Sequence, residues 1–209
     1  MLDALQRSVN RAFDPGGPRD DGGGPFANSS GAVRVFYHEV IKRHPLGIPT
    51  GEDKRALWPL LSVRLARTLD TLQACENDYF EGGRRLFTPE KAAELKPSIG
   101  WMEYGLFSGA DERAMPAEVT VTQVASRGGG RFRVHLRFTY RDTYETYGRP
   151  PDDSNTFEWT GIASVVFEGG RYVIDDFIPI DGDSGKRLPG LAKLFPECKG
   201  PRWAGTQRY

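Results

Sequence analysis

Two adjacent carboxylates, Asp175 and Asp176, are the residues of this sequence best suited to acid–base chemistry. Both lie in a segment that alternates like a β-strand, and neighbours in a strand point to opposite faces. We therefore do not expect the pair to act as a catalytic dyad. Asp176 alone falls on the apolar face of the predicted strand, while Asp175 is expected to be solvated or paired.

Small residues are the expected neighbours of Asp176. The two-residue turn Gly169-Gly170 joins its strand to the preceding one and fixes the register. In this register Asp176 faces Ala163, with Gly161 next to it. Space there would admit a ligand or water, and burial without a partner would raise the pKa of the carboxylate, as in a general acid or base. The commoner role of a buried aspartate is structural, with bonds to backbone N–H groups or to an arginine, and both interpretations stay open.

Three aromatic residues join Asp176 as candidate ligand-binding residues: Trp101, Tyr104 and Trp159. Their side chains would suit the lining of an apolar cavity. Aromatic residues more often fill a core, which is the alternative at each of these positions.

A stripe of basic residues forms a further candidate site, for an anion. It consists of Arg131, Arg133, His135 and Arg137, which share one face of a predicted strand. The alternative is a solvated face whose charges are offset by Glu118 or Glu158 on neighbouring strands.

Only two cysteines, Cys75 and Cys198, and three histidines occur in the chain. No zinc-type spacing is present, so we predict no metal site, and no phosphate-loop, nucleophile-elbow or dinucleotide motif points to a cofactor. The two thiols are expected either to be unlinked or to form a disulfide. A disulfide would tie the C-terminal tail to a helix and imply an oxidising compartment.

The 28 basic and 28 acidic residues of the 209-residue chain balance. A general nucleic-acid binder usually carries a basic excess, so we expect no nucleic-acid partner. No stretch approaches the roughly 20 apolar residues that span a bilayer, and the first residues lack the apolar core of a secretory signal. The compartment stays open: cytoplasmic as the sequence stands, or periplasmic or secreted if a signal was removed.

Helical periodicity follows a leader, residues 1–28, whose glycine and proline content predicts flexibility. Apolar residues recur at helical spacing over 33–41, with Ser29 or Ser30 as the expected cap. A second helical segment is expected from Thr50, where Thr50 and Asp53 suggest a capping box.

That second segment is predicted to break at Pro59 and to restart at Ser62. After Pro97 the period changes from 3.6 to 2. The predicted strands cover 100–108, 117–125, 131–140, 156–168 and 171–178. Helices followed by antiparallel strands indicate a single α+β domain over 29–209, with the helices on one face of a curved sheet and a C-terminal tail.

Several short segments resemble one known superfamily. They are Val35-Phe36-Tyr37, Leu60-Leu61-Ser62 with Leu65, residues 104–108, residues 172–176 and the tail 191–203. Their order resembles the nuclear transport factor 2-like (cystatin-like) superfamily and, more narrowly, an uncharacterised bacterial family within it, many of whose members have export signals. The resemblance implies a bent sheet wrapped around a helix, enclosing a cone-shaped pocket. Some enzymes of this fold use carboxylates in the cone, and Asp176 is the one residue in a comparable place.

The expected function is therefore a binding module, which holds a small apolar ligand or a partner protein in the pocket or on the sheet face. The alternative is a small acid–base enzyme, an isomerase, dehydratase or hydrolase, with Asp176 as the proton carrier. A third interpretation is a protein-interaction or inhibitor role in the cell envelope. The lack of a complete catalytic set favours binding over catalysis. The resemblance also implies a homodimer as one option, because cone-shaped domains often pair through the sheet.

Overall fold

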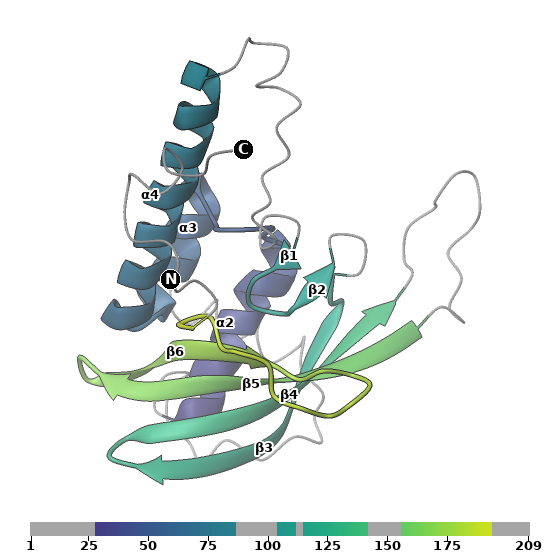
Figure 1. Cartoon of the computed structure of the whole chain (residues 1–209). Helices are drawn as coiled ribbons and strands as arrows, with labels where there is room; N and C mark the ends of the chain where they lie inside the picture. The colour runs from purple at the N-terminus through teal and green to yellow at the C-terminus, as the bar shows by residue number, and fades with distance from the viewer. Residues whose placement is uncertain (1–27, 87–103, 112–114, 142–155, 194–209) are drawn as a thin grey trace.

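The computed structural model describes residues 28–86, 104–111, 115–141 and 156–193, apart from the side chains of 78–86, 104 and 111. These residues form three α-helices, a short 3-10 helix and two antiparallel sheets. Figure 1 shows the helices gathered on one side of the larger sheet. The predicted α+β class is confirmed.

Helix α2, Ser29–Arg43, follows the apolar spacing seen in the sequence. Its positions Val33, Phe36 and Val40 are almost completely buried, as a helix with one apolar stripe requires. The cap differs from the prediction, because Asn28 accepts the N–H of Gly31 through its side-chain oxygen at 2.7 Å. Asn28 has extended backbone geometry, and both predicted serine caps lie inside the helix.

Helix α3, Gly51–Leu57, runs into the 3-10 turn Trp58–Leu60, and α4 covers Val63–Leu86. Pro59 interrupts the helix as predicted, because proline cannot donate the N–H that would continue it. Ser62 restarts it: its hydroxyl accepts the N–H of Leu65 at 3.0 Å. Thr50 stands at the start of α3 without a side-chain capping bond, so the predicted capping box does not form.

The larger sheet has four antiparallel strands in chain order. They are β3 (Glu118–Gly128), β4 (Arg131–Arg141), β5 (Thr156–Glu168) and β6 (Arg171–Pro179). All four were predicted from alternation and glycine turns. Since each strand pairs only with its neighbours in sequence, β3 and β6 are the two edges.

β1 (Tyr104–Gly105) and β2 (Ala110–Asp111) form a second, two-stranded sheet whose strands do not pair with those of the larger one. One strand over 100–108 was predicted, and in the described part this is wrong. Residues 106–109 form a turn, in which the N–H of Gly109 donates to the carbonyl of Gly105 at 2.7 Å. Gly109 has a φ of +69°, which an L side chain rarely adopts.

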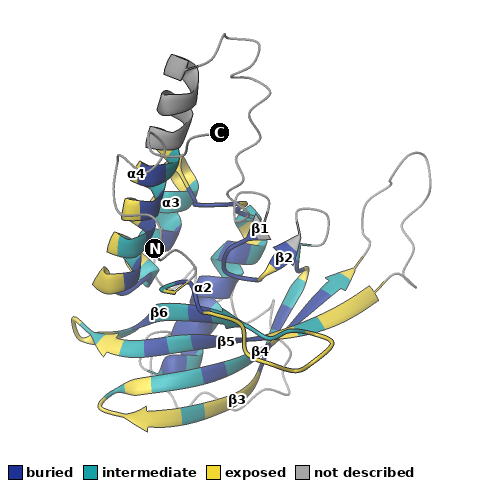
Figure 2. Ribbon diagram, in the orientation of Figure 1, coloured by how far each residue is buried: buried dark blue, intermediate teal, exposed yellow. Residues whose placement is uncertain are grey.

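Helix α2 packs against the larger sheet and contacts all four of its strands. We call the face that it covers the inner face and the opposite one the outer face. Tyr37 of α2 is fully buried there, with its ring 5.5 Å from that of Phe138 and its hydroxyl donating to the carbonyl of Phe107 at 2.9 Å. Burial raises the pKa of Tyr37 well above its usual value, which keeps the phenol neutral. Figure 2 shows the same layering, with buried positions along α2 and the strands beneath it.

Candidate functional site

A β-bulge in β6 decides where the two aspartates lie. From the turn to Ile174 the pairing is as predicted, with Phe167 opposite Tyr172 and Val165 opposite Ile174. The register then shifts by one residue, so that Ser164 pairs with Asp176. An extra residue in one strand moves every later side chain to the other face. The prediction that Asp176 faces Ala163 on the apolar face is therefore wrong.

Phe177 occupies the position that was predicted for Asp176. It pairs with Ala163 and is fully buried. A Cβ placed on Gly161 would lie 2.5 Å from the ring of Phe177 and 3.1 Å from that of Phe138. The predicted space beside these small residues is filled by aromatic rings.

Asp176 instead lies on the outer side of β6, half-buried beneath the segment that follows the strand. Its Oδ1 accepts the N–H of Phe177 at 2.9 Å and that of Ala192 at 3.2 Å. Burial raises the pKa of Asp176, and the two N–H bonds oppose that rise without cancelling it. Gly190 packs directly on the carboxylate, because a Cβ there would lie 2.8 Å from Cγ of Asp176. In these contacts the side chain ties residues 190–192 to β6.

Asp175 is the extra residue of the bulge, and its carboxylate is bound by two residues at the start of α4. It accepts the hydroxyl of Ser62 at 2.6 Å, and Arg64 donates to both of its carboxylate oxygens at 3.0 and 2.8 Å. Burial alone would raise the pKa of Asp175, but the bonds from Arg64 and Ser62 outweigh it and lower the pKa. The expectation of a paired or solvated Asp175 is confirmed as paired.

Trp159 belongs to a row of aromatic rings on the inner face. Its ring stacks on that of Phe138 at 5.4 Å and lies 5.6 Å from that of Phe157, which stacks on Tyr140 at 4.9 Å. The indole N–H of Trp159 donates to the carbonyl of Ser108 at 2.8 Å. We call these four residues the aromatic row. It runs from the buried Phe138 through Trp159 to Phe157, which is 45 % exposed.

The predicted ligand-binding residues are therefore not brought together in the part of the chain that can be described. Trp159 lies on the inner face and Asp176 on the outer one, separated by the sheet. Trp101 and the side chain of Tyr104 lie outside the described residues. Phe157 and Tyr140 were not singled out in sequence, although both alternate in phase with Trp159 and Phe138 on paired strands, which was the available signal.

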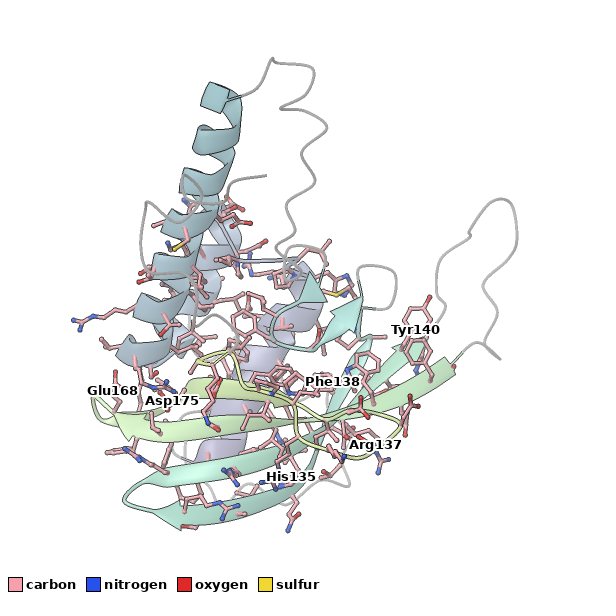
Figure 3. The ribbon with its side chains drawn as sticks, viewed as in Figure 1. His135, Arg137, Phe138, Tyr140, Glu168 and Asp175 are labelled. Atoms are coloured by element: carbon pink, nitrogen blue, oxygen red, sulfur yellow. The ribbon has the colours of Figure 1, made fainter. Side chains whose placement is uncertain are left out.

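The basic stripe of β4 divides into three parts, and the charge of Arg131, at one end, helps to lower the pKa of Asp175. Arg137 lies 3.7 Å from Glu158, so its charge is offset as one of the two interpretations expected. Glu118 does not serve the stripe, because it pairs with Arg141 at 3.0 Å. Arg133 and His135 are in no ion pair within the described ranges, and two further arginines lie near them. Figure 3 labels His135 and Arg137 on this outer face.

The described residues were compared with the requirements of a metal site and of a membrane-spanning helix. They contain no group of three or more His, Cys, Asp or Glu side chains able to hold a metal ion. No helix among them has the length and apolar character needed to cross a bilayer. Cys75 is fully buried in α4 and is not a free thiol. Cys198 lies outside the described residues, so its pairing with Cys75 stays a prediction.

Comparison with known proteins yields no match to a family model, to a curated protein or to a solved structure. The order of helices and antiparallel strands is compatible with the nuclear transport factor 2-like fold. The function must therefore be argued from the residues themselves.

Proposed function

We propose that this protein is a non-catalytic binding module of the nuclear transport factor 2-like type, which holds a small apolar ligand against the aromatic row. The observation that carries the proposal is the continuity of the row from the core to the surface. Phe138 belongs to the buried core and the partly buried Trp159 packs against it, whereas Phe157 is 45 % exposed. An apolar ligand placed there would cover ring surface that is otherwise exposed to water.

The rigidity of the row supports a binding role. Trp159 is held by stacking on Phe138 and by its hydrogen bond to Ser108, so little side-chain freedom would be lost when a ligand binds. Phe157 is ordered by stacking on Tyr140, and its ring lies tilted against that of Trp159. Aromatic platforms arranged before the ligand arrives offer flat apolar surface at low entropic cost. A partner protein that inserts an apolar side chain would use the same surface.

The test uses Nile red, a neutral apolar dye, as the probe for the row. Phe157→Ala should weaken dye binding by about tenfold, because a ring that would be covered by the ligand is lost. The matched control is Phe167→Ala. Phe167 lies on the same face of the same strand, is 55 % exposed, and stands at the opposite end, against Tyr172. Equal losses in both variants, or no loss in Phe157→Ala, would contradict the proposal.

The alternative function, an acid–base enzyme, is favoured by one observation, the raised pKa of Asp176. The contacts of this carboxylate with Phe177, Ala192 and Gly190 suit a structural role better. Asp176→Ala separates the two, because it removes the oxygen that accepts the N–H groups of Phe177 and Ala192, whereas asparagine would keep such an oxygen. A structural role predicts a lower midpoint of urea unfolding. A catalytic role predicts an unchanged midpoint, and that result would favour the enzyme.

A further inference from the structure

Four basic side chains gather on the outer face of the sheet: Arg127, Arg133, His135 and Arg187. We call them the outer-face cluster. Arg133 and His135 are alternate residues of β4, opposite Ser164 and Ile162 of β5. Ser164 is flanked by the inner residues Ala163 and Val165, which places the β4 pair on the outer face. Arg127 comes from the neighbouring edge strand β3, close to the turn into β4.

Arg187 reaches the cluster from a distant part of the sequence. Beyond β6 the chain turns between Asp181 and Lys186, which are joined by a hydrogen bond of 2.8 Å, and it returns along β6. The backbone of Arg187 pairs with that of Ile180 in an isolated antiparallel β-bridge, and the N–H of Leu188 donates to the carbonyl of Pro179 at 2.9 Å. Figure 1 shows this returning segment crossing in front of β4 and β5. The charge of Arg187 contributes to lowering the pKa of both Arg133 and His135.

None of the four side chains is in an ion pair within the described ranges. Arg137, the next residue of β4 on this face, differs because it pairs with Glu158. Burial and repulsion from Arg127 and Arg187 lower the pKa of Arg133. Three guanidinium groups that repel one another beside an imidazole, on a chain whose total charges balance, mark a place where an anion would remove repulsion.

We propose that the outer-face cluster binds a small phosphate-type oxyanion carrying one or two phosphate groups. Three guanidinium groups present paired N–H donors that match phosphate oxygens. Along β4 the cluster is bordered by Arg137, whose charge is already offset by Glu158. A nucleic acid would need an extended array of free cations, so a small anion fits the surface better.

His135 adds a dependence on pH to this site. Burial and the charges of Arg187, Arg133 and Arg127 lower its pKa, so the imidazole is neutral near pH 7. The residues opposite it on the neighbouring strands, Gln123 and Ile162, are uncharged. A bound anion would offset the three positive charges and favour the imidazolium. Binding of an anion of constant charge should therefore tighten as the pH falls.

The proposal is tested by calorimetric titration of the full chain with inorganic pyrophosphate, at an ionic strength held constant with sodium chloride. Arg133→Gln and Arg187→Gln should each weaken binding by about tenfold, the loss of one charge-assisted contact. Arg137→Gln is the matched control, on the same strand and face but paired with Glu158, and should bind as the wild type does. Thermal melts of all three variants establish that the fold is kept.

Three results would overturn the proposal. They are unchanged binding in Arg133→Gln and Arg187→Gln, an equal loss in Arg137→Gln, and tighter binding of a tetraglutamate peptide than of pyrophosphate. The last result would assign the cluster to acidic peptides. A second titration uses sulfate, which keeps its charge between about pH 5.5 and 8. Sulfate should bind more tightly at the lower pH in the wild type, and this change should vanish in His135→Gln. A pH dependence that persists in His135→Gln would contradict the role of the imidazole.

Discussion

The hydroxyl of Ser62 donates to the carboxylate of Asp175 at 2.6 Å and accepts the N–H of Leu65 at 3.0 Å. One side chain thus caps α4 and also joins that helix to the bulge of β6. The backbone follows the same connection, since the N–H of Ser62 donates to the carbonyl of Ile174 at 2.7 Å. The start of α4 therefore occupies part of the free edge of β6, which reduces the unpaired edge of the sheet.

Replacing this hydroxyl should destabilise the protein. Ser62→Ala removes a helix cap and leaves Asp175 with Arg64 as its remaining side-chain partner. We expect a loss of about 2 kcal/mol in the free energy of unfolding, measured by urea denaturation. Thr71→Ala serves as the control, because Thr71 is exposed on α4 and its hydroxyl donates to the carbonyl of Arg67 within the same helix. It should change the free energy by less than about 0.5 kcal/mol. Similar effects in the two variants would show that Ser62 acts as an ordinary surface hydroxyl.

The Asp175 contacts should also make stability depend on acid pH. The folded-state pKa of Asp175 is lowered from 3.8, so the ionised carboxylate favours the folded state. This contribution is fully present above about pH 4 and is lost as the pH falls through the lower folded pKa. Asp175→Asn should therefore be less stable than the wild type at pH 6, and the difference should shrink towards pH 2.5. Urea unfolding across this range measures it. A difference that grows on acidification would reverse the sign and refute the assignment.

Gly190 should tolerate no side chain while Asp176 is present. The Cβ of an alanine there would meet the carboxylate, 2.8 Å from Cγ and 2.9 Å from Oδ1. Gly190→Ala should cost about 1–3 kcal/mol of unfolding free energy, as for overpacking. Gly182→Ala is the control in the same returning segment, because nothing lies within 4 Å of its Cβ position.

A double variant shows whether the cost comes from this contact. In an Asp176→Ala background, Gly190→Ala should cost clearly less than it does in the wild type, because the two residues are in direct contact. Unfolding free energies of the four proteins complete the cycle. Additive costs would mean that the strain at Gly190 arises elsewhere.

Cys75 carries a prediction about the C-terminal tail. It is buried on α4 and is not a free thiol, and Cys198 is the other cysteine of the chain. We expect a Cys75–Cys198 disulfide, so that the intact mass rises by two hydrogen atoms on reduction. Reduction should also lower the free energy of unfolding by about 2–4 kcal/mol, because a long loop is released in the unfolded chain. An unchanged mass would exclude the bridge within one chain.

Local patterns were enough to predict most of the elements. The apolar spacing of α2 and α4, the break at Pro59 and the alternation of β3 to β6 are properties of neighbouring residues, and the structure has each of them. The turn at Gly169-Gly170 also predicted the pairing of β5 with β6 as far as Ile174. A tight turn transmits its register only while both strands stay regular.

Tertiary structure alone decided what happens after Ile174. The bulge at Asp175 accompanies contacts with Ser62 and Arg64, which are more than a hundred residues away in sequence. It exchanges the predicted positions of Asp176 and Phe177, and with them the expected polar group in the core. Local sequence patterns do not predict the outer-face cluster either, because Arg187 joins it only through the returning segment. Periodicity reports which face of an element is apolar, whereas long-range contacts decide the register and the side chains that meet across the sheet.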